Sequence, residues 1–489
     1  MKKLFVIDKN DNVAVALEAL PKGYTENGIS LVEDIPFAHK VALHNMKKGD
    51  SIIKYNNIIG TLTRDVKAGE HIHTHNLKTN LTSDFEYSFS GNNSYIPEKC
   101  NAFFYGYKRP DGSVGTRNEI WVISTVGCVN NTIDMLVQNA KSKCYNDIDG
   151  VFGYTHPFGC SQMGDDQENT RKIISALIRH PNAGGVLVVS LGCENSNAEV
   201  IKKYLGDYDK KRVKFLVTQN VDNELEVGEK LIDELHDYVK EFKREEVSAQ
   251  KLVIGLKCGG SDALSGITAN PLCGKVTDKI TSFGASAVLT EVPEMFGAEH
   301  ILMKRAESKV TYEKTVSLIK GFKNYFSSHN QECFDNPSPG NHDGGITTLE
   351  EKSLGCIQKG GNSIITDVIN YGEQVKKSGL SLLNGPGNDI VATTNLAACG
   401  ANIILFTTGR GTPLGAPVPT IKISSNTPLF ERKNGWIDFD SGRLLSGDDI
   451  QNLSVELFDL ILKTASGYKT KNETNDYRQI SIFKDGVIM

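Results

Sequence analysis

Six apolar runs rich in valine and isoleucine recur about every 30 residues between residues 119 and 293, and they constrain the fold more than any other feature. They are EIWVISTVG, GVFGYTH, GGVLVVSLG, VKFLVTQ, KLVIGLKC and ASAVLTEVP. Because they lack strict alternation of apolar and polar residues, they suit strands that are buried on both faces. Helical patterns such as DDQENTRKIISALIRH separate them. Strands that alternate with helices in this way predict βαβ units and a largely parallel sheet.

The α/β part divides into two lobes. The charge-dense run KEFKREE, near residues 240–246, predicts the end of a first lobe over residues 102–248. A second lobe is expected over 249–489, and it contains one more clear strand, ANIILFTTG. A chain of 489 residues is long enough for this division, since domains usually span roughly 100–200 residues.

The first 81 residues follow a different pattern. Short apolar runs such as LFVI, SIIKY and IIGTL are separated by the turn signals KND, PKG, KKGD and KAGE. Strands of four to six residues at such close intervals predict a small all-β unit over residues 1–81. One helix is expected near Val13–Leu20. The polar stretch after this unit has no periodicity, and we interpret residues 82–101 as a linker.

Composition excludes several classes of function. The formal net charge of −5 argues against a nucleic-acid-binding protein, which usually carries a basic face. No apolar run approaches the roughly 20 residues that span a bilayer, and the N-terminus lacks the apolar core of a signal peptide. The ten cysteines are therefore interpreted as reduced thiols of a cytoplasmic protein. The sequence does not fix the oligomeric state, and a homo-oligomer remains an option.

Four cysteines follow predicted strands directly. They are Cys128, Cys160, Cys193 and Cys258. Ligands bind outside the carboxyl ends of strands in open α/β sheets, so we expect these thiols to lie at one sheet edge and to bind a metal in one crevice. Their spacing of about 30 residues or more matches no compact zinc motif. The alternative is that each cysteine is a small buried apolar residue.

Histidines gather in the motif GEHIHTHN. In a strand, His71, His73 and His75 point to the same face, because side chains alternate with a period of two. A row of imidazoles is a natural site for Fe²⁺, Mn²⁺ or Zn²⁺. A solvated strand face is the alternative. The pair His39–Lys40 in PFAHKVAL is a weaker signal on its own.

Several glycine-rich loops suit anion binding without indicating a nucleotide. LKCGGSDALSGITANP, NPSPGNHDGGITTLEEKSLG and FTTGRGTPLGAPVPT combine glycine with serine, threonine and asparagine. None fits GxxxxGK[ST], and no GxGxxG opens a helix after the first strand. Arg410, between two glycines, is a candidate carboxylate clamp because guanidinium pairs bidentately with carboxylates. It could equally tie loops together.

These motifs resemble the altronate/galactarate dehydratase family over essentially the whole chain. The matching segments are DNVAVAL, GEHIHTHN, DGSVGTRNE, TVGCVN, THPFGCSQMGDD, LGCEN, CGGSDALSGITANP, LTEVPEMFGAE, NPSPGN, GGITTLEEKSLGC and TTGRGTP. The resemblance implies an N-terminal β-clip (SAF) domain followed by two α/β lobes. It also implies a metal-dependent hydro-lyase of hexuronate breakdown, usually associated with Fe²⁺ or Mn²⁺. The signature of His73, His75 and Asn76 is similar to the altronate branch, so the expected reaction converts D-altronate to 2-dehydro-3-deoxy-D-gluconate and water.

Such a reaction needs a base for the C2 proton, an acid for the C3 hydroxyl and stabilisation of an enediolate. We expect His39 and His156 to be the acid–base pair, with Lys40 as an alternative base if burial lowers its pKa. The candidate substrate-binding residues are Asn76, Ser261, Asp262, Asn341 and Arg410. The candidate metal ligands are His73, His75, Cys128, Cys160, Cys193 and Cys258.

Other functions remain open at this point. Within the family, the chain could act on galactarate or remove sulfite from a sulfo-hydroxy acid. Outside the family, it could be an NAD-dependent sugar-acid oxidoreductase, which the missing GxGxxG disfavours. A non-catalytic sugar-acid sensor is a third alternative, and the density of polar loop motifs argues against it.

Overall fold

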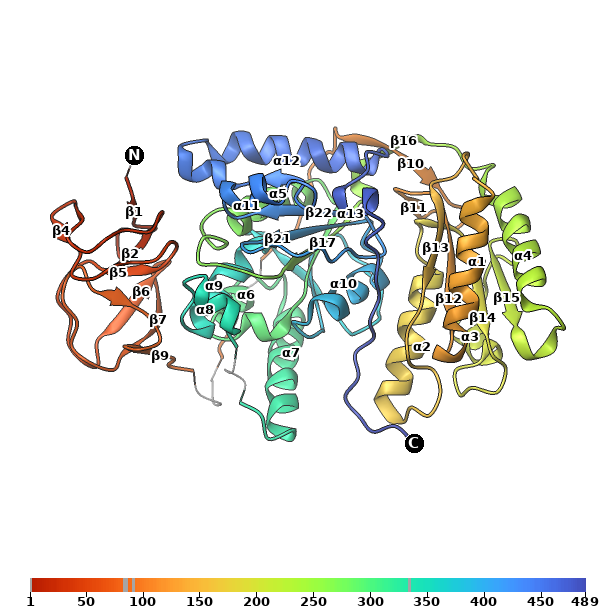
Figure 1. Ribbon diagram of the computed structural model, residues 1–489, viewed down its shortest axis with the longest axis horizontal. Coiled ribbons are helices and arrows are strands. Elements are labelled where there is room, and N and C mark those ends of the chain that lie inside the picture. Colours follow the sequence, from red (N-terminus) through yellow and green to blue (C-terminus); the bar gives the residue numbers. More distant parts are fainter. Residues whose placement is uncertain (1, 82–86, 90–92, 333–335) are drawn as a thin grey trace.

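The N-terminal segment folds into short antiparallel strands, as the spacing of its turn signals predicts. The computed structural model describes residues 2–81, 87–89, 93–332 and 336–489. The strands are β1 (Leu4–Phe5), β2 (Val13–Ala16), β3 (Thr25–Glu26), β4 (Ile29–Ser30), β5 (Lys40–Ala42), β6 (Ser51–Lys54), β7 (Asn57–Leu62), β8 (His71–Ile72) and β9 (Leu77–Lys78). They form sheets in the orders β1-β2-β5-β8, β3-β4 and β6-β7-β9. Figure 1 shows this unit at one end of the molecule.

The helix expected near Val13–Leu20 is wrong. Residues Val13–Ala16 form strand β2, which pairs antiparallel with both β1 and β5. All four of its residues are buried. Its central position in the sheet therefore outweighs the helix propensity of the alanines and leucines that follow it.

The stretch predicted as a linker lies partly outside the described residues, since 82–86 and 90–92 are not described. Its described parts have no regular secondary structure. They lie against the C-terminal lobe: the Tyr95 hydroxyl donates to the carbonyl oxygen of Thr281, and Asn93 Nδ2 donates to those of Lys304 and Ala306.

The next part carries a four-stranded parallel sheet in the order β13-β12-β14-β15. Its strands are β12 (Glu119–Ser124), β13 (Gly150–Tyr154), β14 (Ala183–Ser190) and β15 (Val213–Val217). Its helices are α1 (Asn130–Ser142), α2 (Gly164–Ile178), α3 (Ala198–Leu205) and α4 (Glu224–Val239). A small antiparallel sheet in the order β11-β10-β16 lies beside it, built from β10 (Phe103–Lys108), β11 (Val114–Gly115) and β16 (Glu245–Ser248).

The C-terminal part is built on a seven-stranded parallel sheet in the order β19-β20-β18-β17-β21-β22-β23. The strands are β17 (Val253–Cys258), β18 (Ser286–Leu289), β19 (Ile365–Ile369), β20 (Gly379–Leu383), β21 (Ile403–Thr408), β22 (Thr420–Ser424) and β23 (Phe439–Asp440). The helices are α5 (Ala269–Ser282), α6 (Glu299–Met303), α7 (Lys309–Ser328), α8 (Pro339–Asp343), α9 (Leu349–Cys356), α10 (Asp389–Ala398), α11 (Thr427–Arg432), α12 (Ile450–Ala465) and α13 (Lys471–Thr474). The predicted fold class, an all-β unit followed by α/β lobes with parallel sheets, is confirmed.

The two α/β lobes share a hydrophobic core. Apolar side chains of α2 and α3 pack with those of α10 in one cluster, while α1 and α4 cover the other face of the four-stranded sheet. Figure 1 shows the second lobe at the end opposite the β unit, with the C-terminal lobe between them. No helix in the described parts of the chain is both long and apolar enough to cross a membrane.

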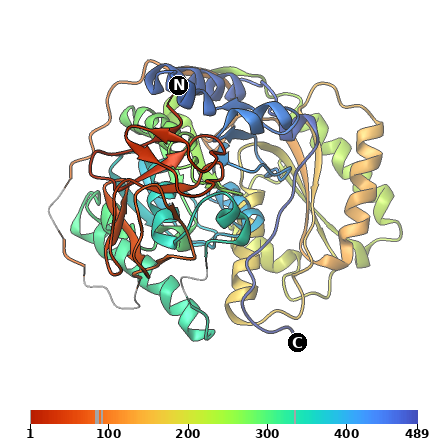
Figure 2. The ribbon, with the colours of Figure 1, turned by 60° about the vertical axis from the view of Figure 1, so that its left-hand side comes forward.

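A buried ion triad joins the β unit to the C-terminal lobe. The Glu351 carboxylate on α9 accepts from the ammonium groups of Lys40 on β5 and Lys54 on β6, at 2.8 and 2.7 Å. None of these side chains is more than 1% exposed. Figure 2, turned to bring the β unit forward, shows that unit in front of the C-terminal lobe.

Candidate functional site

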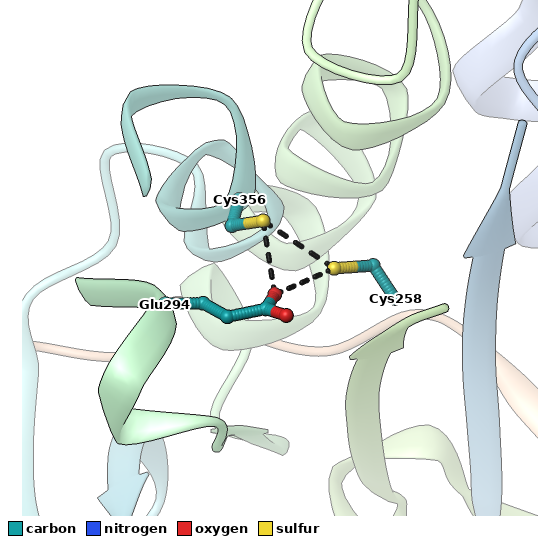
Figure 3. A group of neighbouring side chains, drawn as sticks. All are labelled: Cys258, Glu294 and Cys356. Atoms are coloured by element: carbon teal, nitrogen blue, oxygen red, sulfur yellow. Dashed lines mark hydrogen bonds between the residues drawn. The ribbon is translucent and has the colours of Figure 1, made fainter. Parts of the chain in front are cut away.

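Two thiols and a carboxylate meet at the carboxyl end of the central strand β17. Cys258 is the last residue of β17, Cys356 is the last residue of α9, and Glu294 lies in the 3-10 helix Val292–Met295 that follows β18. Both thiols donate to Glu294 Oε2, at 3.0 and 3.1 Å, and the two sulfur atoms are 3.4 Å apart. Figure 3 shows the three side chains converging from three separate elements. Among the described residues, this is the one group of three potential metal ligands whose ligand atoms lie within 4.8 Å of one another.

Charged side chains surround this group: Lys257, Lys352, Lys359, Glu291 and Asp389. Lys352 Nζ lies 2.9 Å from Glu294 Oε1. Burial alone would raise the pKa of Glu294, but the nearby ammonium groups hold it well below its ordinary value. The hydrogen bond to Cys258, together with burial, raises the pKa of the Cys356 thiol well above its ordinary value. The carboxylate is therefore ionised and Cys356 carries a proton.

These residues fit a divalent metal ion. Three lysines balance three carboxylates around the two thiols, so the formal charge of the group, counted with neutral cysteine side chains, is zero. A dication that replaces the two thiol protons keeps this charge at zero, and metal binding to cysteine does release protons. Thiolate ligands favour Fe²⁺ or Zn²⁺, whereas Mn²⁺ prefers carboxylate, carbonyl and water oxygen. The donor set thus favours Fe²⁺ over Mn²⁺.

A cleft of about 260 Å³ opens beside Cys258 and Glu294. Two of the predicted substrate-binding residues, Ser261 and Asn341, line it. The Asn341 side chain is already engaged: its Nδ2 donates to the carbonyl oxygen of Ser261, and its Oδ1 accepts from Ser338 and Lys352. Asn341 therefore shapes the wall of the cleft.

Five histidines gather where the β unit meets the C-terminal lobe: His39, His71, His73, His75 and His342. Their rings lie in a chain of neighbours with centroids 4.9–5.9 Å apart. His39 Nδ1 is 2.9 Å from His71 Nε2, so one of these imidazoles donates to the other. Burial, reinforced by the neighbouring imidazoles, lowers the pKa of His71 to about 3, and burial with Lys40 nearby lowers that of His73 to about 4. Both rings are neutral at pH 7.

The short helix α8 separates the histidines from the cleft and touches both. His39 Nε2 lies 3.3 Å from the carbonyl oxygen of Asp343, at the end of α8. Arg410, about half exposed, donates to the carbonyl oxygen of Gly340 at 3.2 Å and lies 3.7 Å from the Asp343 carboxylate. Arg410 thus places a partly exposed cation beside α8, where it can receive an anionic ligand.

Three other predicted site residues have their polar atoms occupied inside the protein. Lys40 donates to Gly345, Thr347 and Glu351, and it is fully buried. Asn76 Oδ1 accepts from the backbone N–H of His73 and its Nδ2 donates to the carbonyl oxygen of His71, so Asn76 fixes the histidine loop. The Asp262 carboxylate accepts from the side chains of Ser265, Ser425 and Asn426.

The expectation that all four strand-end cysteines lie at one sheet edge is wrong. Cys128, Cys160 and Cys193 follow β12, β13 and β14 of the four-stranded sheet, whereas Cys258 ends β17 of the other sheet. The even spacing of apolar runs conceals the break between the sheets, because β17 begins a new sheet after the small strand β16.

His156 also lies in the second lobe, in the loop that follows β13. Its Nε2 is 2.9 Å from the carbonyl oxygen of Ser124 and its Nδ1 accepts from the N–H of Phe158. The structure therefore does not bring His156 together with His39.

Sequence reasoning did not single out Cys356 and His342, and it did not include His71 and Glu294 in the final set of site residues. Glu291 and Glu294 follow the sixth apolar run, where the strand-end rule places potential ligands, although the predicted metal ligands are limited to histidines and cysteines. Cys356 ends a helix, so the strand-end rule does not reach it, although it is the last residue of the matching segment GGITTLEEKSLGC.

Comparisons with known proteins agree with this architecture. Residues 2–80 match the altronate/galactarate dehydratase SAF domain, and residues 106–240 match the second domain of D-galactarate dehydratase/altronate hydrolase. Residues 249–488 match the C-terminal domain of D-galactarate/altronate dehydratase.

Relatives of similar length match the chain from end to end. An altronate dehydratase of Bacillus subtilis is 49% identical over 100% of both chains, and one of Escherichia coli is 46% identical over 98% of both. The galactarate dehydratase (L-threo-forming) of Escherichia coli is 32% identical over 98% of this chain and 96% of its own. The resemblance inferred from the sequence motifs is confirmed, and the chain belongs to the D-galactarate/altronate dehydratase family.

Proposed function

We propose that this protein dehydrates D-altronate to 2-dehydro-3-deoxy-D-gluconate with the help of a divalent metal ion, Fe²⁺ in preference to Mn²⁺. The observation that carries the proposal is the end-to-end match to two altronate dehydratases at 49% and 46% identity. The match to galactarate dehydratase is equally long but falls to 32% identity. Galactarate is therefore the second candidate substrate.

The reaction is assigned to the region around α8. Arg410 supplies positive charge for the substrate carboxylate, and the Ser261 side chain lines the adjoining cleft, where it can bind a hydroxyl. Cys258, Cys356 and Glu294 would hold the metal. A bound divalent ion supplies Lewis-acid stabilisation of the negative charge that develops when the C2 proton leaves.

His39 is the base that we assign to the C2 proton. Burial lowers its pKa, so the ring is neutral at pH 7. With its Nδ1–H donating to His71, its Nε2 becomes the basic atom once substrate displaces it from the carbonyl oxygen of Asp343. The hydrogen bond to His71 fixes the orientation of the His39 ring. His156, in the other lobe, takes no part in this assignment, and Lys40 serves the ion triad instead.

The test is an anaerobic assay with added Fe²⁺ on a panel of D-altronate, galactarate and D-gluconate, read as 2-keto-3-deoxy acid. D-altronate is expected to give the highest kcat/KM. Preferred turnover of galactarate would replace the proposed substrate with the second candidate, and turnover of none of the three would refute dehydration of sugar acids. The nicotinamide absorbance of added NAD should stay constant throughout.

Metal dependence is tested on the same preparation. Exhaustive chelation should abolish activity, and Fe²⁺ should restore it more fully than Mn²⁺, because two of the three proposed ligands are thiolates. Full turnover by a sample shown to be free of metal would refute this part of the proposal while leaving the substrate assignment intact.

A further inference from the structure

Three exposed cysteines share the carboxyl edge of the four-stranded sheet in the second lobe. Cys128 follows β12, Cys160 follows β13 and Cys193 follows β14, and these strands are direct neighbours in the order β13-β12-β14. Adjacent strands lie about 4.8 Å apart. The topology therefore places three thiols along one short edge, although up to 65 residues separate them in the sequence.

Hydrogen bonds tie the three loops into one structure. The N–H of Gly127 donates to the carbonyl oxygen of Phe158 at 2.9 Å, which joins the Cys128 loop to the Cys160 loop. The N–H of Ser161 donates to Asn195 Oδ1 at 3.0 Å, which joins the Cys160 loop to the Cys193 loop. Each bond lies within two residues of the cysteines that it links, and consecutive Cα atoms are only about 3.8 Å apart.

The buried Glu194 carboxylate holds the base of these loops. It accepts from the hydroxyls of Thr125 and Ser190, both at 2.5 Å, and from the N–H groups of Leu191 and Gly192. Gly159 has a φ of +102°, and a Cβ there would lie 1.9 Å from the carbonyl oxygen of Thr125. The thiols thus stand on a preorganised frame.

The three thiols also share their position in front of helices. Each cysteine lies shortly before the first residue of a helix: Asn130 of α1, Gly164 of α2 and Ala198 of α3. A helix N-terminus carries a partial positive charge and free N–H groups, which suit an anionic ligand. A cysteine that serves only packing is usually buried, as Cys273 and Cys399 are. Cys128, Cys160 and Cys193 are all exposed, so packing does not explain their presence.

The spacing excludes a compact site for one ion. The three thiols are not among the ligand groups that lie within 4.8 Å of one another in the described residues. Three thiolates around a single ion at about 2.3 Å would lie closer than that to one another. In an iron–sulfur cluster each thiolate binds a different iron, so its protein ligands stand farther apart.

We propose that Cys128, Cys160 and Cys193 bind a [4Fe–4S] cluster, each through one iron, with the fourth iron open to solvent or to a small oxygen ligand. Binding costs each thiol its proton and requires Fe²⁺, Fe³⁺ and sulfide from outside. This centre lies on a different sheet from the Cys258–Glu294–Cys356 group, so it goes beyond the proposed function and does not depend on it.

The first test measures cluster assembly in the full-length protein. After anaerobic purification and incubation with iron and sulfide, the protein should hold about four irons and about four acid-labile sulfides per chain, with visible charge-transfer absorbance. Cys128→Ser, Cys160→Ser and Cys193→Ser should each lose most of the sulfide. Two control variants should keep the sulfide: Cys144→Ser, which removes an exposed thiol outside this edge, and Cys258→Ser.

The second test keeps the wild-type sequence and so avoids any effect of substitution on folding. Alkylation of the reconstituted protein, mapped by mass spectrometry, should spare Cys128, Cys160 and Cys193 and modify Cys144. Chelation of the iron should expose all four. Iron bound without sulfide, equal sulfide in a triple Cys128/Cys160/Cys193→Ser variant, or equal alkylation before and after chelation would each overturn the proposal.

Discussion

The Cys258 thiol is the residue that most directly separates a metal site from a buried hydrogen-bond cluster. In Cys258→Ser the hydroxyl still donates to Glu294, but it is a poor ligand for Fe²⁺. We expect iron content and kcat each to fall at least about tenfold, since even the loss of outer-shell partners of a metal costs about 10–100-fold. The measurements are iron per chain, after subtracting the sulfide-bound fraction, and steady-state kinetics with D-altronate.

The matched control is Cys399→Ser. Cys399 is also buried in the C-terminal lobe, and its thiol donates to the carbonyl oxygen of Leu396 at 3.0 Å, outside the candidate metal group. It should keep both iron and kcat. Normal iron content and normal kcat in Cys258→Ser would show that Cys258 is not a metal ligand and that the Cys258–Cys356 pair is structural.

At His39 the question is whether the imidazole acts on substrate. Removing a general base typically costs about 10²–10⁴ in rate, so His39→Gln should lower kcat by about 100-fold or more with a smaller change in KM. His44→Gln is the control, because His44 is an exposed histidine of the same β unit outside the cluster of five. An unchanged kcat in His39→Gln, with normal thermal stability, would remove the base assignment.

At the scale of elements, the sequence predicts strands far better than it predicts which sheet they join. The apolar runs mark β12 to β15, β17, β18 and β21, because burial on both faces leaves a continuous Val/Ile signature. The same signature carries no information on pairing partners, which is why Cys258 was grouped with the cysteines of another sheet. The sequence does not predict Cys356 and His342 as site residues. They lie in the helices α9 and α8, which the rule for residues that follow strands does not cover.

The ion triad shows how one helix, α9, secures the β unit. Burial alone would raise the pKa of Glu351, but the ammonium groups of Lys40 and Lys54 lower it to about 2. Burial, with repulsion from Lys54, lowers the pKa of Lys40 to about 8. Burial alone would also lower the pKa of Lys54, but the Glu351 carboxylate raises it above its ordinary value. Two lysines therefore depend on a single carboxylate.

Glu351→Gln should lower the free energy of unfolding by about 3–5 kcal/mol, because it leaves two buried ammonium groups without a counter-charge. The measurement is urea unfolding at pH 7. Glu456→Gln is the control: Glu456 pairs with Arg443 at the surface, where both side chains are more than 40% exposed, and its loss should cost less than about 1 kcal/mol. Equal costs in the two variants would show that the triad is not a buried clamp.

At the scale of the whole molecule, the two α/β lobes meet through a core that includes a buried imidazole. His180 stacks on Trp121, and its Nε2 lies 3.1 Å from the carbonyl oxygen of Ala401 in the other lobe. Its Nδ1 accepts from the N–H of Asn182. Burial, with repulsion from the nearby guanidinium groups of Arg212 and Arg109, lowers the pKa of His180 to about 3.

This imidazole makes the joined lobes sensitive to acid. In the unfolded chain His180 has a pKa near 6.5, so between that value and about 3 the unfolded state binds a proton that the folded state does not. The stabilisation is complete above about pH 6.5 and is lost, at about 1.4 kcal/mol per pH unit, as the pH falls toward 3. Protonation of carboxylates lowers the free energy of unfolding further at lower pH, so the informative interval is pH 6.5 to 5.

The measurement is urea unfolding at both ends of this interval. Between pH 6.5 and pH 5, the free energy of unfolding of the wild type should fall by about 2 kcal/mol more than that of His180→Gln, whereas His44→Gln should follow the wild type. Parallel curves for the wild type and His180→Gln would mean that protonation of this interface does not govern how the lobes separate in acid.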